Sequence, residues 1–250
     1  GQLVGGRRAA DAAADRWQHD DAGKLTLWGA AIENGRPLQT TNWIVGCDPS
    51  QGVDQANTCL AVMDATTGAI VAEYVDASVK PHEAAMLAMA IGYWFGGQVG
   101  CAFQIWEQNG PGISYGHEIV KNNYTWSYFQ RSVETKSQRA SKRYGWTSTG
   151  PAKELLFDLL DKSLRSGEFS TPSREGCDEM AAWVHDEYGR IVCGTWADES
   201  SGAQARHGDR AIAYALCVLA RRELPQYRRE AQKFPVNTYG HILGMHKVFH

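Results

Sequence analysis

Three acidic residues stand where the sequence predicts the ends of core elements. Asp48 follows the apolar run of residues 43–47, and Glu107 follows the apolar run of residues 101–106. Asp209 precedes a long apolar stretch with helical spacing. If the two strands are parallel neighbours, Asp48 and Glu107 meet at the edge where open α/β sheets place their ligands. A helix packed across that edge would add Asp209.

Carboxylates gathered in this way repel one another, and each raises the pKa of its neighbours. They stay ionised together only beside a compensating cation, and all-oxygen sites favour hard ions such as Mg²⁺ or Mn²⁺. Two such ions about 3.5–4 Å apart can activate water and stabilise the leaving oxygen of a phosphodiester. The sequence therefore predicts Asp48, Glu107 and Asp209 as catalytic, metal-binding residues of a two-metal hydrolase.

Each acid also has a simpler interpretation. Asp48 precedes Pro49, and Asp-Pro is a common turn sequence. Asp209 could serve only to stabilise its helix, through the interaction of its negative charge with the positive end of the helix dipole. Glu107 is harder to explain structurally, because it directly follows a core strand. Other acids could reach the same rim, namely Asp54, Asp198 and Glu199.

The elements that would position these acids follow from periodicity and turn signals. Three strands are expected first, with Thr66-Thr67-Gly68 forming a hairpin turn, and a helix then runs from Pro81 to Gly96-Gly97. The pattern is typical of an α/β protein with a mixed sheet, an antiparallel meander followed by parallel strands, flanked by helices. Strands are expected at 43–47, 58–63, 69–75, 101–106, 127–130 and 191–193, and later helices at 113–121, 151–164, 175–187 and 204–222.

The chain divides into a leader over residues 1–41, one domain over 42–224 and a tail over 225–250. Apolar residues form 43% of the 250 residues, enough for a core. The net charge of −3 argues mildly against nucleic acid, but divalent ions can complete an acidic site. The 6 cysteines form no Cys-x-x-Cys pair and are expected to be reduced, and no apolar run reaches the length of a membrane span.

Basic residues that could contact DNA phosphates lie in the second half of the chain. A polar segment near residues 136–144 carries most of them, beside Tyr144 and Trp146. Lys153 could position a scissile phosphate near the carboxylates. An ordinary solvated surface is the competing interpretation for all of them. The candidate DNA-binding residues are Lys136, Arg139, Lys142, Arg143, Lys153 and Arg210, with Arg131 in the same cluster.

Four segments together resemble the nuclease domain of viral, tailed-bacteriophage-type terminase large subunits. Residues 45–54 are similar to the first acidic motif of that family. Residues 107–112, Glu-Gln-Asn-Gly-Pro-Gly, are similar to its second acidic motif, in which an acid is followed by Asn-Gly-Pro-Gly. Residues 144–148 with Lys153 resemble its Gly-Trp-x-Thr…Lys segment, and 207–215 its closing acidic helix. One departure is Gly208, which stands where many relatives have another Asp.

The resemblance implies a ribonuclease-H-like fold and an endonuclease that cuts concatemeric double-stranded viral DNA during genome packaging. It implies that Asp48, Glu107 and Asp209 bind the metal. It also implies that the protein acts in the bacterial host cytoplasm and transiently at the procapsid portal. Expected partners are DNA, a small terminase subunit and the portal. The resemblance also implies an ATPase motor, which is expected upstream in the full-length chain. No Gly-x-x-x-x-Gly-Lys-Ser/Thr loop occurs here, so no ATPase activity is expected in this chain.

Two rival functions stay open. A Holliday-junction resolvase or transposase-type enzyme of the same fold would prefer branched DNA or transfer strands. A non-catalytic packaging or docking module would use its acids only structurally, and it would bind no divalent metal.

Overall fold

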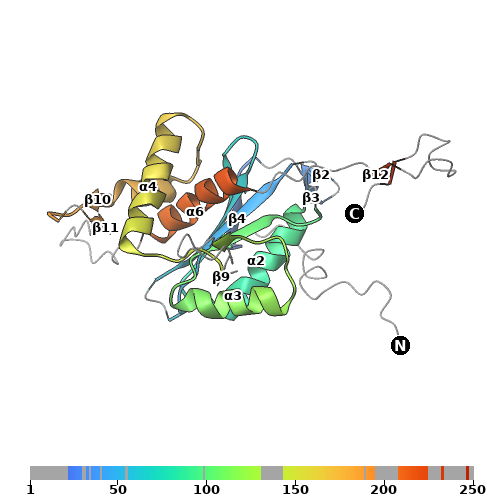
Figure 1. The fold of residues 1–250 in the computed structure, drawn as a ribbon, viewed down its shortest axis with the longest axis horizontal. Coiled ribbons are helices and arrows are strands. Elements are labelled where there is room, and N and C mark those ends of the chain that lie inside the picture. The colour runs from blue at the N-terminus through green and yellow to red at the C-terminus, as the bar shows by residue number, and fades with distance from the viewer. Residues whose placement is uncertain are drawn as a thin grey trace, which may run out of the picture.

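A mixed five-stranded sheet forms the centre of the computed structural model (Figure 1). The structure describes residues 22–29, 32–33, 35–39, 41–53, 56–97, 99–130, 143–188, 190–194, 208–224, 232–233 and 246–247. The strand order is β1-β6-β5-β4-β7. The bounds are β1 Leu25–Leu27, β4 Trp43–Asp48, β5 Thr58–Asp64, β6 Ile70–Asp76 and β7 Phe103–Trp106.

The strand β5 pairs antiparallel with both β4 and β6, its neighbours in the sequence, so the predicted meander is confirmed. The strand β7 pairs parallel to β4, with Cys47 opposite Trp106. The N–H of Glu107 continues this ladder by donating to the carbonyl of Cys47 at 3.0 Å. The carboxyl ends of β4 and β7 therefore lie side by side, which meets the condition under which the sequence places Asp48 and Glu107 at one edge.

Helices cover both faces of the sheet (Figure 1). One face packs against α2, Pro81–Phe95, and α3, Pro111–Lys121. The other face packs against α6, Asp209–Glu223, and α4, Gly150–Arg165. Consecutive residues of β4 alternate between these layers, with Val45 toward the first and Ile44 toward the second. Burial on both faces explains why β4 reads as an unbroken apolar run.

Two sequence-based expectations need correction. The helix expected over residues 175–187 ends earlier, because α5 spans Arg174–Ala181 and β10, Trp183–His185, then pairs with β11, Ile191–Cys193. Residues 183–185 thus pair with β11 and do not continue the helix α5. The leader over residues 1–41 also contributes to the sheet, because β1 pairs with β6. The remaining strands are β2 Ile32–Glu33, β3 Arg36–Pro37, β8 Phe129–Gln130, β9 Arg143–Tyr144, β12 Gln232–Lys233 and β13 His246–Lys247.

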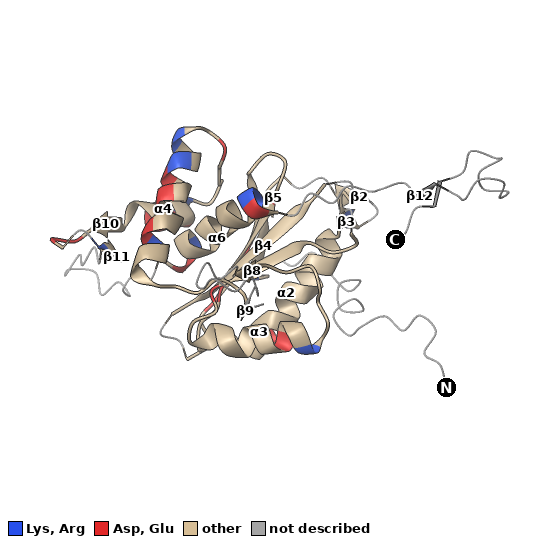
Figure 2. Cartoon of the chain, in the orientation of Figure 1, with Lys and Arg blue, Asp and Glu red and all other residues tan. Residues whose placement is uncertain are grey.

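Charged residues of both signs lie along α4, whereas the visible part of α2 is largely uncharged (Figure 2). This contrast follows the burial of the two helices. All 6 cysteines are free, and three of them, Cys47, Cys59 and Cys217, are buried. No helix in the described part of the chain has the length and hydropathy of a membrane span.

The helix α6 approaches β4 most closely at Gly46. A Cβ atom added at Gly46 would lie 2.4 Å from the backbone oxygen of Ala213 and 2.7 Å from the Sγ of Cys217. Only glycine leaves room for a helix backbone at this separation. This contact sets the distance between α6, which begins with Asp209, and β4, which ends with Asp48.

Replacing Gly46 with alanine should therefore lower the free energy of unfolding by about 1–3 kcal/mol, because a backbone carbonyl must move to admit the methyl group. Urea denaturation measures this change. Gly150→Ala is the matched control, since its added Cβ meets nothing within 4 Å. That control should be neutral or slightly stabilising. Equal effects of both substitutions would contradict the close-approach argument.

Candidate active site

The three acids lie at the same end of the sheet. Asp48 is the last residue of β4, Glu107 directly follows β7, and Asp209 is the first residue of α6. Burial, followed by the charges of Glu107 and Asp209, raises the pKa of Asp48 well above its usual range. A hydrogen bond between the side chains of Asp48 and Glu107 raises it further. The structure thus brings together the three residues that the sequence singled out.

A hollow of about 220 Å³ opens between Asp48 and Asp209. The residues that follow β4 form much of its wall, and Pro111 at the start of α3 closes one side. The buried Asp209 accepts a hydrogen bond at its Oδ2 from the backbone N–H of Asn57, at 2.8 Å. Asp209 therefore ties the start of α6 to the β4–β5 connection as well as contributing charge.

The segment after Glu107 turns back sharply into α3. Gly110 caps the helix with a φ of 51°, and Pro111 occupies the first turn, where its missing N–H costs nothing. A Cβ atom on Gly112 would lie 1.8 Å from the carbonyl oxygen of Glu107. The Asn-Gly-Pro-Gly sequence is thus explained by the tight return of the chain beside Glu107.

The second and third sequence motifs are joined by hydrogen bonds. The side chain of Asn109 donates to the carbonyl of Ser148 at 2.9 Å and accepts from the N–H of Ser148 at 2.7 Å. The N–H of Gln108 donates to the carbonyl of Trp146 at 2.7 Å. These contacts hold the chain that leads into α4 against the strand end that carries Glu107.

Lys153 lies on α4 within electrostatic range of the acids. Its charge lowers the pKa of Asp48, against the stronger effects that raise it. Its Nζ lies 5.4 Å from the centroid of the Trp183 ring, a cation–π contact. Lys153 is therefore a cation at the rim of the acidic site.

Arg210, which the sequence predicts to contact DNA, directs its guanidinium toward Glu73 and Glu179. Its Nε lies 2.8 Å from Glu73 and its Nη1 lies 2.5 Å from Glu179, and its side chain is only 18% exposed. Two buried carboxylates therefore occupy its guanidinium, which corrects the expectation of a phosphate contact. Arg143 belongs to β9, while Lys136, Arg139 and Lys142, with Asp54, Asp198 and Glu199, lie outside the described residues.

Gly208 fills its position for a steric reason. It adopts a left-handed φ of 66°, and an added Cβ would lie 2.6 Å from the Nε1 of Trp183 and 3.1 Å from the Sγ of Cys193. An aspartate at this position would displace the indole of Trp183. Asp209 is therefore the acid that this end of α6 contributes in the described part of the chain.

The donor chemistry of the site suits a hard divalent cation. Asp48 and Asp209 face one hollow, and carboxylate oxygens are the ligands that Mg²⁺ and Mn²⁺ prefer. Within the described residues, no three His, Cys, Asp or Glu side chains are arranged to hold a metal ion by themselves. Mg²⁺ commonly takes only one or two carboxylates and completes its shell with water and phosphate oxygens, so this open arrangement fits it.

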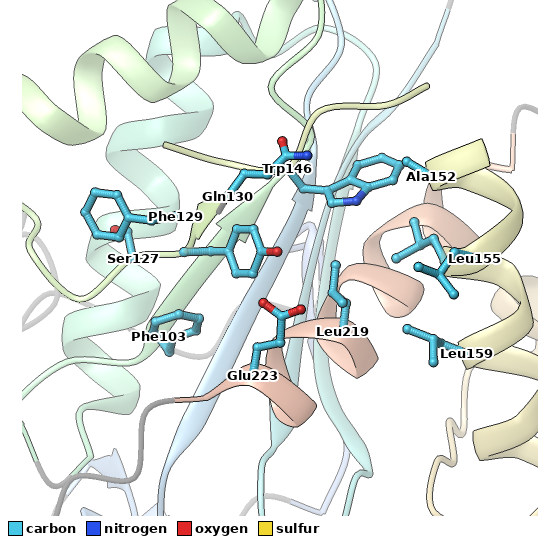
Figure 3. A pocket seen from close by; sticks show the side chains of 12 residues that line it. Phe103, Ser127, Phe129, Gln130, Trp146, Ala152, Leu155, Leu159, Leu219 and Glu223 are labelled. Atoms are coloured by element: carbon cyan, nitrogen blue, oxygen red, sulfur yellow. The ribbon is translucent and has the colours of Figure 1, made fainter. Parts of the chain in front are cut away.

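A larger cavity of about 550 Å³ lies between β8, α4 and the end of α6 (Figure 3). Leu155 and Leu159 of α4 project into it, opposite Phe103 and beside Trp146. Its lining is mainly apolar, and none of the three acids belongs to it. It is therefore separate from the acidic site.

Several contributors to the site could not be found from the sequence. Asn57 acts through its backbone N–H, which no residue pattern reveals. Glu73 and Glu179 are buried acids far from the motifs in sequence. An acid inside the otherwise apolar run of β6 was the one available signal for Glu73, because buried charges require partners.

In the absence of metal, Asp48→Asn should stabilise the fold at neutral pH by about 1 kcal/mol or more. The raised pKa of Asp48 means that its ionised form is disfavoured by folding. This penalty grows as the pH rises above the ordinary carboxyl pKa of about 4, and it disappears at about pH 3 and below, where both states are protonated. Thermal melts in EDTA across about pH 3–8 measure it, with exposed Asp158→Asn on α4 as control. A destabilised Asp48→Asn protein at pH 7 would contradict the prediction.

Comparison with known proteins gives matches to solved structures only. No protein-family model matches the sequence, and no curated protein matches it. The large terminase nuclease of thermophilic phage G20c, solved with bound magnesium, superposes with a TM-score of 0.55 at 15% identity, covering 86% of this chain and 98% of that chain. The Thermus phage P74-26 large terminase nuclease domain superposes with a TM-score of 0.54 at 15% identity, covering 84% and 94%. The chain therefore shares the fold of these phage large terminase nuclease domains.

Proposed function

We propose that this protein is a metal-dependent endonuclease that cleaves concatemeric double-stranded viral DNA during genome packaging. The observation that carries the proposal is the meeting of Asp48, Glu107 and Asp209 at one sheet end, close enough to perturb the pKa of Asp48. The fold supports it, because the similar nuclease structures are described with bound magnesium or cobalt. The acidic site and the fold thus both support metal-dependent cleavage of DNA.

In this proposal Asp48, Glu107 and Asp209 hold Mg²⁺ or Mn²⁺, with two ions in the active state. Bound ions of this kind supply an activated water and stabilise the leaving oxygen of the phosphodiester. The chain itself supplies the carboxylates that bind the ions and the rigid strand ends that orient these carboxylates. The backbone N–H of Asn57 donates to the Oδ2 of Asp209 and so orients its carboxylate at the hollow.

Lys153 positions the scissile phosphate in this mechanism. It is the cation near Asp48 in the described part of the site, and its contact with Trp183 restricts its motion. Lys136, Arg139, Lys142 and Arg143 are proposed to bind flanking phosphates without reading sequence, because phosphate contacts position DNA and carry no base information.

The packaging context extends the proposal to partners. An ATPase motor upstream in the full-length chain would move DNA past the nuclease, and a small terminase subunit and the portal would assemble with it. The site of action would then be the bacterial host cytoplasm, and transiently the procapsid portal. These partners follow from the resemblance of the chain to terminase nucleases.

Supercoiled plasmid incubated with the protein and Mn²⁺ or Mg²⁺ should be nicked and linearised, and EDTA should stop the reaction. Asp48→Ala, Glu107→Ala and Asp209→Ala should each lower the rate by more than about 100-fold, because each removes a direct metal ligand. Gel analysis of the products measures the rate. Asp158→Ala on the exposed face of α4 is the control and should cleave normally.

Cleavage that survives both EDTA and Asp48→Ala would falsify the proposal. Comparing linear duplex with a four-way junction tests the resolvase alternative, which requires a strong preference for the junction. Calorimetric titration with Mn²⁺ tests the docking-module alternative, which requires that no heat of binding is observed.

Lys153→Gln should weaken DNA binding to a similar degree on every sequence and lower the salt slope of binding by about 1. The physical reason is the loss of one phosphate contact and its released counterion. Fluorescence anisotropy in Ca²⁺ over a range of salt concentrations measures it. Lys162→Gln, in the exposed last turn of the same helix, is the matched control and should leave the slope unchanged. An unchanged slope for Lys153→Gln would remove Lys153 from the phosphate site.

A further inference from the structure

A second cluster of charges lies directly behind the acidic site. It is centred on Arg210, the residue after Asp209, and its carboxylates come from two other elements: Glu73 from β6 and Glu179 from α5. Glu73 and Glu179 are 6% and 7% exposed. Isolated charges at such depth are strongly unfavourable, so the cluster depends on complete pairing.

The pairing in this cluster is dense. Arg210 donates from Nε to Glu73 at 2.8 Å and from Nη1 to Glu179, and the hydroxyl of the fully buried Tyr214 also donates to Glu73. Burial disfavours the charged form of Arg210, but the hydrogen bonds that its guanidinium donates to Glu73 and Glu179 outweigh this effect and raise its pKa further above the usual value. Arg210 is therefore a cation held between β6 and α5, two elements that are distant in sequence.

Glu179 also completes the start of α6. Gly208, the N-cap residue, has no side chain that could accept from the first-turn N–H groups. The Oε2 of Glu179 accepts instead from the backbone N–H of Arg210, at 2.7 Å. One carboxylate from α5 thus caps α6 and binds the side chain of the capped residue.

We infer that Arg210, Glu73 and Glu179 form a clamp that positions Asp209 for metal binding. The clamp fixes the backbone on one side of Asp209, and Asn57 fixes its carboxylate on the other. Arg210, Glu73 and Glu179 are positioning residues, because none of them reaches the hollow between Asp48 and Asp209. This inference rests on the proposed function, since it assigns the clamp a role at the same metal site.

The test uses Glu179→Ala, which removes the cap and leaves Arg210 paired with Glu73. Arg210→Lys is the second variant, because it keeps the charge and loses the planar fork. Arg221→Lys is the matched control: Arg221 also fixes α6, at its far end, through the carbonyls of Ala65, Thr66 and Glu168. Melting curves establish that each variant is folded.

The expected result for both clamp variants is a rise of about 10-fold or more in the Mn²⁺ dissociation constant by calorimetry. The kcat for plasmid cleavage should fall, while KM for DNA stays within about twofold. In metal-free Glu179→Ala, the amide of Arg210 should exchange its hydrogen faster. Arg221→Lys should leave the Mn²⁺ dissociation constant unchanged even if it lowers the melting temperature.

Three outcomes overturn the inference. One is a folded clamp variant with wild-type Mn²⁺ affinity. Another is an equal loss of Mn²⁺ affinity in Arg221→Lys, which would make the effect one of general stability. The third is a raised KM for DNA with unchanged metal affinity, which would make Arg210 a DNA contact. Wild-type protein that binds no Mn²⁺ would instead overturn the proposed function, and the same titration reveals this before any variant is compared.

Discussion

The architecture of the site depends on the contact between the backbones of α6 and β4 at Gly46. Because no side chain separates them there, Ala213 and Cys217 lie directly over the strand. The first residue of α6 then falls beside the last residue of β4. A larger residue at position 46 would separate Asp209 from Asp48, so a packing constraint in the core sets the geometry of the surface chemistry.

Two acidic clusters on either side of the α6 terminus differ in how their charge is compensated. Behind the helix, Glu73 and Glu179 share the half-buried guanidinium of Arg210, so that cluster is satisfied within the protein. In front, Asp48 lies among carboxylates with Lys153 acting at longer range, and its pKa is raised. The difference separates a cluster whose charge is satisfied within the protein from one whose negative charge a bound cation would compensate. This contrast, more than the number of acids, favours a metal site.

The second acidic residue is held by a different means. Glu107 stands at the turn between β7 and α3, where Gly112 allows the chain to fold back against the carbonyl of Glu107. Asn109 then bonds to Ser148, just before the helix that carries Lys153. The segments that carry the carboxylate and the cation are therefore linked by the side chain of Asn109 to the backbone of Ser148, so the fold sets their separation.

The sequence by itself determined the core strands β4 to β7 and most helix bounds, and it singled out the three acids, because local periodicity and strand-ending carboxylates are visible along the chain. Whether β4 and β7 would be parallel neighbours was left as a condition by the sequence, and the tertiary structure decided it. Only the tertiary structure decided the role of Arg210: a basic residue beside an acid reads as a phosphate contact until Glu73 and Glu179 are seen around it. Pairing of β1 with β6 and of β10 with β11 was likewise hidden, because short strands are specified by their partners and carry little pattern of their own.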